Sequence, residues 1–155
     1  MLIDIRDIKK STAAKKKYCF DEDIDIYENG SLCPLISVEA EFTNAGKTII
    51  VKGILRSEIE IQCCKCLEPF SCKIDASFRE EFLPYSHQAI SSKKMMSPED
   101  LDIFFYENDT IDLKEICRQL CLVSIPLMPL CKENCKGLCG SCGENLNISE
   151  CSCNN

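Results

Sequence analysis

The chain has 155 residues, enough for one hydrophobic core but not for two independent domains with linkers. Hydrophobic residues make up 45% of it and charged residues 28%, proportions that exclude a globally disordered protein. The net charge of -7 excludes a protein that coats nucleic acid through bulk electrostatics, since that mode requires a basic surface. We expect one cooperative domain with three segments: a charged segment 1–30, a core 31–130 and a cysteine-rich extension 131–155.

The N-terminal sequence predicts the cellular compartment, and the compartment in turn indicates what the cysteines do. Asp4 and Asp7 stand where a secretory signal requires a basic end followed by an apolar run. No stretch approaches the roughly 18 apolar residues of a membrane span. We therefore expect a cytoplasmic protein. In that reducing compartment, fourteen cysteines favour metal ligation over a disulfide framework.

The first segment, 1–30, is divided by charge. Basic residues up to Lys17 are followed at once by acidic residues from Asp21 to Glu28. The basic cluster Lys15, Lys16 and Lys17 is a candidate contact for phosphates. The simpler interpretation is a solvated arm, or two runs of opposite charge that neutralise each other.

The core begins with alternating apolar and polar residues, the pattern of half-buried strands. The expected strands lie at 38–42, 48–55, 58–63 and 71–78. A turn at 44–47 joins the first two, and Gly53 is interpreted as a bulge. The pattern predicts a meander of antiparallel strands.

The second half of the core changes character. Residues 84–100 are polar and predict a loop, with a short helical turn capped at 97–100, and 103–106 predicts another strand. Apolar residues at helical spacing predict a helix over 113–124 that packs on the sheet. It begins at Asp112 and Glu115, whose spacing resembles a capping box, and Pro126 and Pro129 then hold the chain extended. The fold class is therefore α+β, an antiparallel sheet with one packed helix.

The extension carries the chemistry that the sequence shows most clearly. Cys139, Cys142 and Gly143 form a C-x-x-C-G knuckle, in which two thiolates reach one ion and the glycine permits the tight turn. Four sulfurs in tetrahedral array are the usual structural zinc site. We expect a structural Zn²⁺ that staples the extension. Four of the following six cysteines are the expected ligands: Cys131, Cys135, Cys139, Cys142, Cys151 and Cys153.

A second C-x-x-C, formed by Cys63 and Cys66, leaves an alternative open. In a zinc ribbon these two residues would join Cys139 and Cys142. That arrangement closes a loop of about 70 residues, which costs about 1.5 to 2 kcal/mol more than the short loops of the C-terminal cluster. We favour the C-terminal cluster, although the difference is small beside the roughly 10 to 16 kcal/mol that a structural zinc supplies.

Other chemistry is less well supported. A redox C-x-x-C requires its first cysteine at a helix N-terminus, and neither pair obviously opens a helix. An iron–sulfur cluster would also use four cysteines, but the knuckle glycine favours zinc. The single histidine, His87, lies in a polar segment away from the cysteines, and phosphate-binding and zinc-protease motifs are absent from the sequence. We expect a protein that is not an enzyme.

The order of these motifs resembles that of a known family. The matching residues are Cys63-x-x-Cys66-Leu67-Glu68-Pro69-Phe70, Phe78, Glu81-Phe82, Ile111-Asp112-Leu113, Pro126-Leu127-x-Pro129-Leu130-Cys131 and Cys135-Lys136-Gly137-Leu138-Cys139-x-x-Cys142-Gly143-x-Asn145-Leu146-Asn147. This pattern is similar to that of the YceD-like family, the large ribosomal RNA subunit accumulation proteins of bacteria and plastids. The resemblance covers residues 48–153.

The resemblance implies a non-catalytic factor for accumulation or processing of large-subunit (23S) ribosomal RNA and for assembly of the large subunit. Its partner would be that RNA, a basic ribosomal protein or a pre-ribosomal particle, with no small-molecule substrate and no membrane. As a hypothesis, Lys65 and the cluster Lys15, Lys16 and Lys17 contact RNA phosphates. The alternative function, which rests on the cysteines alone, is a redox- or metal-responsive switch in which oxidation releases zinc.

Overall fold

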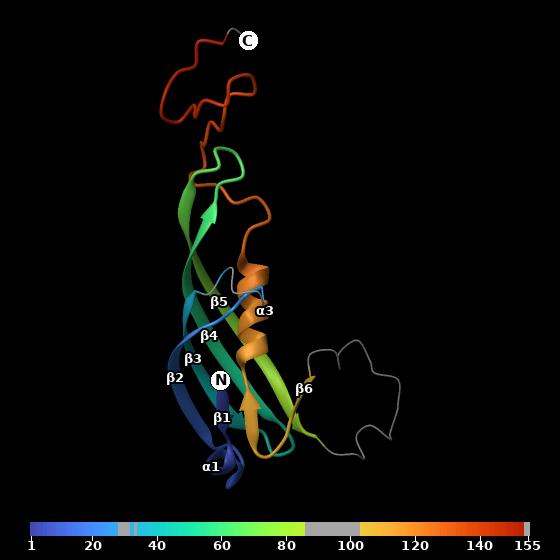
Figure 1. Cartoon of the computed structure of the whole chain (residues 1–155). Coiled ribbons are helices and arrows are strands. Elements are labelled where there is room, and N and C mark those ends of the chain that lie inside the picture. Colours follow the sequence, from blue (N-terminus) through green and yellow to red (C-terminus); the bar gives the residue numbers. More distant parts are fainter. Residues whose placement is uncertain (28–31, 33, 86–102, 154–155) are drawn as a thin grey trace.

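The computed structural model describes residues 1–27, 32, 34–85 and 103–153 (Figure 1). The predicted features at 86–102, including His87 and the capped turn at 97–100, lie outside the described residues. The elements in chain order are β1 (Leu2–Asp4), α1 (Arg6–Lys9), β2 (Lys15–Asp23), β3 (Leu35–Asn44), β4 (Ile49–Gln62), β5 (Pro69–Pro84), β6 (Ile103–Tyr106), β7 (Thr110–Asp112) and α3 (Lys114–Ser124).

The fold is built on a five-stranded sheet of order β2-β3-β4-β5-β6, beside a small pair formed by β1 and β7. Pairing is antiparallel from β2 to β5, as expected from the sequence, but β6 is parallel to β5, so the sheet is mixed. The sequence pattern could not show this, because the direction of β6 depends on the long connection before it.

One strand of the sheet is longer than predicted. The expected strands 48–55 and 58–63 are a single strand, β4, which pairs with β5 along its whole length. The inward and outward alternation of side chains does not break between the two predicted strands. Leu55, Ser57 and Ile59 all lie on the same face of the strand, and Leu55 and Ile59 are buried there. The β4–β5 hairpin therefore extends well beyond its neighbours (Figure 1).

Gly53 does not form a bulge. It lies in regular register between Ala40 of β3 and Phe78 of β5. A Cβ atom at this position would lie 2.5 Å from the ring of Phe78 and 2.8 Å from the carbonyl oxygen of Glu39. Glycine is required here because an aromatic ring packs directly on the strand.

The charged N-terminal segment is part of the sheet and is not a solvated arm. Its residues Lys15–Asp23 form the edge strand β2, which pairs residue by residue with β3. Tyr18 and Phe20 are half-buried and make the apolar contacts between this strand and the core. The charged residues at the two ends of β2 are exposed, except Glu22, which is half-buried.

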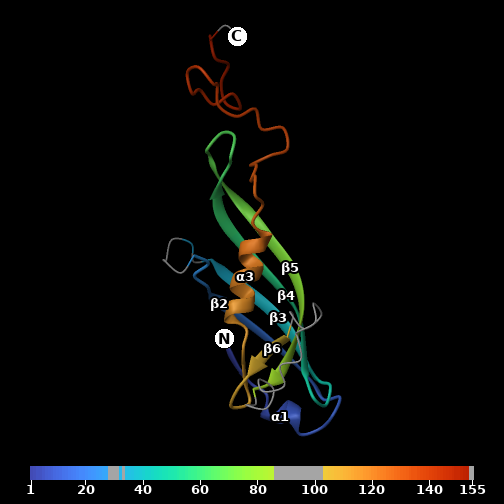
Figure 2. The ribbon, with the colours of Figure 1, turned by 90° about the vertical axis from the view of Figure 1, so that its right-hand side faces the viewer.

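The core lies on one face of the sheet, where α3 covers it (Figure 2). Helix α3 packs against β5 through Ile116, Cys117 and Cys121, which are buried as predicted. The carboxylate of Asp112 accepts a hydrogen bond from the backbone N–H of Lys114, but Glu115 pairs with Arg118 and does not complete the capping box. We call the covered face the inner face and the opposite, open face the outer face.

The turn between β3 and β4 has the expected position, and the side chain of Asn44 holds it in place. Asn44 is buried, and its side chain accepts a hydrogen bond from Gly46 N–H while donating to the carbonyl oxygens of Ile8 and Ser11. One amide thus fixes both the hairpin turn and the segment after α1. None of the helices in the described part of the chain is long and apolar enough to cross a membrane.

Candidate metal centre

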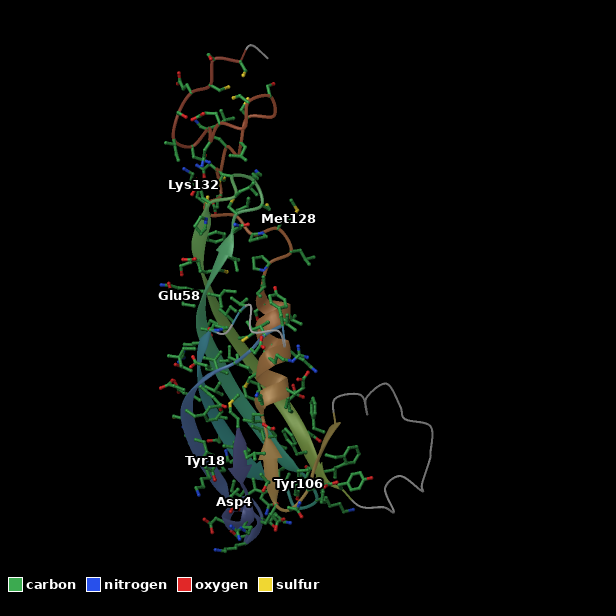
Figure 3. The ribbon with its side chains drawn as sticks, viewed as in Figure 1. Asp4, Tyr18, Glu58, Tyr106, Met128 and Lys132 are labelled. Atoms are coloured by element: carbon green, nitrogen blue, oxygen red, sulfur yellow. The ribbon has the colours of Figure 1, made fainter. Side chains whose placement is uncertain are left out.

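Two sets of four cysteines lie at the end of the molecule where the β4–β5 hairpin meets the C-terminal extension (Figure 3). The first set, site 1, consists of Cys63, Cys66, Cys131 and Cys135. The second set, site 2, consists of Cys139, Cys142, Cys151 and Cys153. Within each set all four sulfur atoms lie within 4.8 Å of one another.

Site 1 joins two distant parts of the sequence. Cys63 follows the last residue of β4, and the turn is closed by hydrogen bonds from Leu67 N–H to the Cys63 carbonyl and from Cys63 N–H to the Glu68 carbonyl. The extension crosses this turn, where Cys64 N–H donates to the Pro129 carbonyl at 2.8 Å. The hairpin tip and residues 129–135 therefore contribute two cysteines each to site 1.

The surroundings of site 1 are apolar and close-fitting. Cys63, Cys66 and Cys135 are buried, and Phe70, Leu130 and Leu138 pack around them. Gly137 adopts a positive φ of 76°, and its Cα faces the backbone of Lys65 so closely that a Cβ would lie 3.1 Å from the Lys65 carbonyl oxygen. Glycine is needed here both for backbone conformation and for space.

Site 2 is local to the extension and more open. The predicted knuckle is formed: Gly143 N–H donates to the Cys139 carbonyl at 2.9 Å, and Gly143 has a φ of 77°. Cys139 is buried, Cys142 is exposed, and Cys151 and Cys153 are half-buried. The bridge between Leu138 and Asn145 closes the loop that carries the knuckle.

The sulfur–sulfur distances fit one tetrahedral ion in each set. For zinc–sulfur bonds of about 2.3 Å, tetrahedral geometry places the sulfurs about 3.8 Å apart. The observed distances are 3.7 Å for Cys63–Cys135 and for Cys66–Cys131, and 3.5 Å for Cys139–Cys151. Disulfide bonds would require about 2.05 Å. The donor set and its spacing therefore suit a thiophilic metal.

Each site contains at least one thiol whose pKa is lowered and at least one whose pKa is raised. Backbone N–H groups of Cys142 and Ser141 lower the pKa of Cys139 to about 6. At Cys63 burial raises the pKa, but hydrogen bonds from backbone N–H groups outweigh burial and lower that pKa to about 6. Burial raises the pKa of Cys131 to about 12, so near neutral pH this thiol keeps its proton unless a metal displaces it.

Asn147 is a supporting residue that the sequence did not single out for this role. Its side-chain amide donates to the Cys135 sulfur at 3.4 Å, and its side-chain oxygen accepts a hydrogen bond from Lys136 N–H. Burial raises the pKa of the Cys135 thiol. Hydrogen bonds from this amide and from Gly137 N–H lower the pKa by more than burial raises it, so the net shift is downward. In the sequence, this role could have been inferred from the position of Asn147, a polar residue in the run Asn145-Leu146-Asn147 between two groups of cysteines.

The grouping contains a four-cysteine set of the favoured C-terminal kind and, in place of the ribbon alternative, a second set. Four of the six C-terminal candidates meet at site 2, while Cys131 and Cys135 join Cys63 and Cys66 at site 1. The pair Cys63 and Cys66 thus has different partners from those of the ribbon alternative. The short-loop argument applies to site 2, whereas at site 1 the packing of α3 on β5 already brings the chain back along the hairpin and so reduces the loop that remains to be closed.

The predicted RNA-contacting lysines are not brought together. Lys15 and Lys17 lie on the outer face, where Lys15 pairs with Glu41 at 3.2 Å, whereas Lys16 pairs with Asp7 at 3.7 Å. Lys65 lies at the hairpin tip, beyond the end of β4 and on the order of 35 Å from the Lys17 row. In Figure 3 the labelled Lys132, which follows the site 1 residue Cys131, lies far along the molecule from Tyr18, which follows Lys17.

A comparison with protein families identifies the chain. A family model described as large ribosomal RNA subunit accumulation protein YceD matches residues 51–155, well over half of the chain. The chain belongs to the YceD family. The match includes both C-x-x-C pairs and all eight cysteines of sites 1 and 2. It thus confirms the resemblance that the motif order indicated.

Individual curated proteins match the chain at 22% to 30% identity. A chloroplastic protein of Zea mays, named large ribosomal RNA subunit accumulation protein YCED homolog 1, is 30% identical over 141 residues, which cover 76% of this chain and 48% of the relative. Its namesake in Arabidopsis thaliana is 22% identical over 95% of this chain and 51% of the relative. An uncharacterized protein of Mycobacterium leprae is 24% identical over 72% of this chain and 49% of the relative.

The chain spans about half the length of the curated relatives that it matches. No solved structure matches it. The family and the cysteine geometry are thus the two independent observations on which a functional interpretation rests.

Proposed function

We propose that this protein is a non-catalytic, zinc-binding factor that supports the accumulation or processing of large-subunit ribosomal RNA and the assembly of the large subunit. The observation that carries the role is membership of the YceD family, whose printed description names that accumulation. The names of the Zea mays and Arabidopsis thaliana relatives support it. The RNA itself, a basic ribosomal protein or a pre-ribosomal particle is the proposed partner, met in the cytoplasm.

The structural part of the proposal is that site 1 and site 2 each hold one Zn²⁺. Four-sulfur coordination leaves no ligand position for water, so each ion would be structural and not catalytic. At site 1, Cys63 and Cys66 from the hairpin and Cys131 and Cys135 from the extension would bind the same ion. The metal would thereby fix the extension on the sheet, since its binding free energy is available only when both parts are in place.

The test of the role is the ratio of large- to small-subunit ribosomal RNA after the protein is depleted, measured together with gradient profiles of ribosomal particles. The proposal predicts a selective fall in large-subunit RNA and an accumulation of incomplete large particles, both reversed by re-expression. An unchanged ratio would contradict the role and leave the metal centre as a separate question.

A redox- or metal-responsive switch is the second candidate, and site 2 is the feature that favours it. Cys142 is exposed, and Cys139 and Cys151 have sulfurs only 3.5 Å apart. A two-electron oxidant, such as a peroxide, would convert two zinc-bound thiolates into one disulfide and release the ion. Zinc release from site 2 at low peroxide, with a parallel change in the ribosomal RNA ratio, would support this switch; zinc retention would contradict it.

A further inference from the structure

The outer face of the sheet carries a shallow groove that crosses the strands from β2 to β5. It has a volume of about 400 Å³. Its floor is backbone, because the side chains of the row formed by Tyr18, Ala40, Gly53 and Phe78 belong to the inner face. Its two walls are the neighbouring rows of outer-face side chains. Helix α3 lies on the other side of the sheet, so the groove is open (Figure 2).

One wall of this groove is a row of charged residues in direct cross-strand register: Lys17, Glu41, Lys52 and Arg79. Adjacent strands lie about 4.8 Å apart, so the row extends for roughly 14 Å. Three of its four members are cations. The opposite wall consists of Cys19, Glu39, Ile54 and Ser77, and Ile54 is 37% exposed.

The carboxylates in both walls are already neutralised by cations from outside the groove. Glu41 accepts a hydrogen bond from Lys15 at 3.2 Å, and Glu39 accepts one from Arg56 at 2.8 Å. By contrast, Lys17, Lys52 and Arg79 are exposed and have no ion-pair partner among the residues that the structure describes. Three unpaired cations in a line are therefore left facing solvent.

This local charge is opposite to that of the whole chain, which carries a net charge of -7. A polyanion would be repelled by most of the surface and attracted only at such a row. We propose that the groove binds the sugar–phosphate backbone of an RNA strand, with phosphates against Lys17, Lys52 and Arg79. The proposal rests on the proposed function, because it names the surface through which that factor would meet RNA.

The opposite wall is consistent with a sugar–phosphate ligand that passes across the strands. Cys19 and Ser77 are small and uncharged, and Ile54 offers an apolar contact to a ribose. Among the described residues that line the groove, no aromatic ring is exposed for a base to stack on. Contacts of this kind position RNA without reading its sequence, so we expect weak, sequence-independent and salt-sensitive binding.

The test uses the full, zinc-loaded chain and a single-stranded RNA of mixed sequence, with affinity measured over a range of salt concentrations. The double variant Lys52→Ala/Arg79→Ala removes two proposed phosphate contacts. We expect affinity to fall roughly tenfold, and the slope of log affinity against log salt to fall in magnitude by about 1.4, since each contact with single-stranded RNA contributes about 0.7. The matched control is Lys73→Ala/Lys114→Ala, which removes two exposed cations that do not line the groove and should leave both values unchanged.

A second pair of variants keeps every cation in place. Ser77→Asp adds a negative charge to the opposite wall and should weaken RNA binding, whereas Ser77→Asn adds similar bulk without charge and should not. Absence of RNA binding by the native chain would overturn the proposal. So would equal losses in the groove and control variants. Loss of association with particles by the groove variant, without any loss of affinity for RNA, would assign the groove to a protein partner and also overturn it.

The outcome is separable from that of the proposed function. If depletion lowers large-subunit RNA but the groove variant binds RNA like the native chain, the role stands and the groove proposal fails. If the groove binds RNA as expected but depletion leaves the RNA ratio unchanged, the groove stands and the role fails.

Discussion

At the scale of single residues, Gly53 occupies the tightest position in the sheet. Its Cα lies under the Phe78 ring, and both neighbouring strands are fixed by continuous hydrogen bonding. Since a Cβ would meet ring and backbone atoms well inside van der Waals contact, either the ring must leave its rotamer or the strands must separate. The exposed Ile54 beside it has no such constraint.

We expect Gly53→Ala to lower the free energy of unfolding by about 1 to 3 kcal/mol, the usual cost of overpacking a core. Urea unfolding followed by circular dichroism would measure the change. Gly140→Ala is the control, because nothing lies within 4 Å of the position its Cβ would occupy. Equal stability of the Gly53→Ala and native chains would show that the ring moves aside freely and that packing does not select glycine here.

At the scale of elements, α3 contains two buried thiols one turn apart. Burial, followed by the proximity of Cys121, raises the pKa of Cys117 to about 12 from its ordinary value of 9. The folded state therefore keeps the proton, whereas the unfolded chain loses it above pH 9. This thiol's stabilising contribution is complete below pH 9 and disappears as the pH rises towards 12.

The expected consequence is a decline in stability above pH 9 that is smaller in Cys117→Ala than in the native chain. Urea midpoints measured across this alkaline range would show the difference as a change of slope, whatever the constant cost of the lost sulfur. Cys19→Ala, which removes an exposed thiol on β2, is the matched control. Identical slopes for Cys117→Ala and the native chain would show that Cys117 ionises without unfolding.

The hairpin and the extension make separate predictions for the two metal sites. We expect the native chain to hold two zinc ions, and both Cys66→Ser and Cys153→Ser to hold one. Only Cys66→Ser should expose residues 125–150 to protease, because it removes a site 1 ligand that belongs to the hairpin. Metal analysis and limited proteolysis would measure this, with Cys64→Ser, an exposed cysteine outside both sets, as control. Loss of both ions from Cys153→Ser would contradict independent sites.

Sequence periodicity predicted elements wherever one face of a strand or helix is buried. It located β3, β5 and α3, and it located the knuckle of Cys139 and Cys142, because these features depend on neighbours in the sequence. It did not predict the partners of Cys63, since these depend on where α3 returns the chain. The edge strand β2 was missed because its charges mask two half-buried aromatic residues.

At the scale of the whole molecule, the metal sites and the basic groove lie towards different ends of the long β4–β5 hairpin (Figure 1). The sheet and α3 are held together by a continuous apolar core that contains none of the metal-site cysteines. The extension contacts this body mainly at the hairpin tip, through Cys64 and Lys65. Removal of metal should therefore detach the extension without unfolding the sheet.

Chemical cross-linking of lysines would test that separation. With zinc bound, a short lysine-reactive reagent should join Lys65 to Lys136, because the Lys65 carbonyl accepts a hydrogen bond from Leu138 N–H at 3.1 Å. It should also join Lys17 to Lys52, which lie two strands apart in the same cross-strand row. After treatment with a zinc chelator under reducing conditions, we expect the first cross-link to disappear and the second to persist, since only the first depends on site 1. Loss of both would mean that the metal stabilises the entire fold, whereas retention of both would mean that backbone contacts alone hold the extension in place.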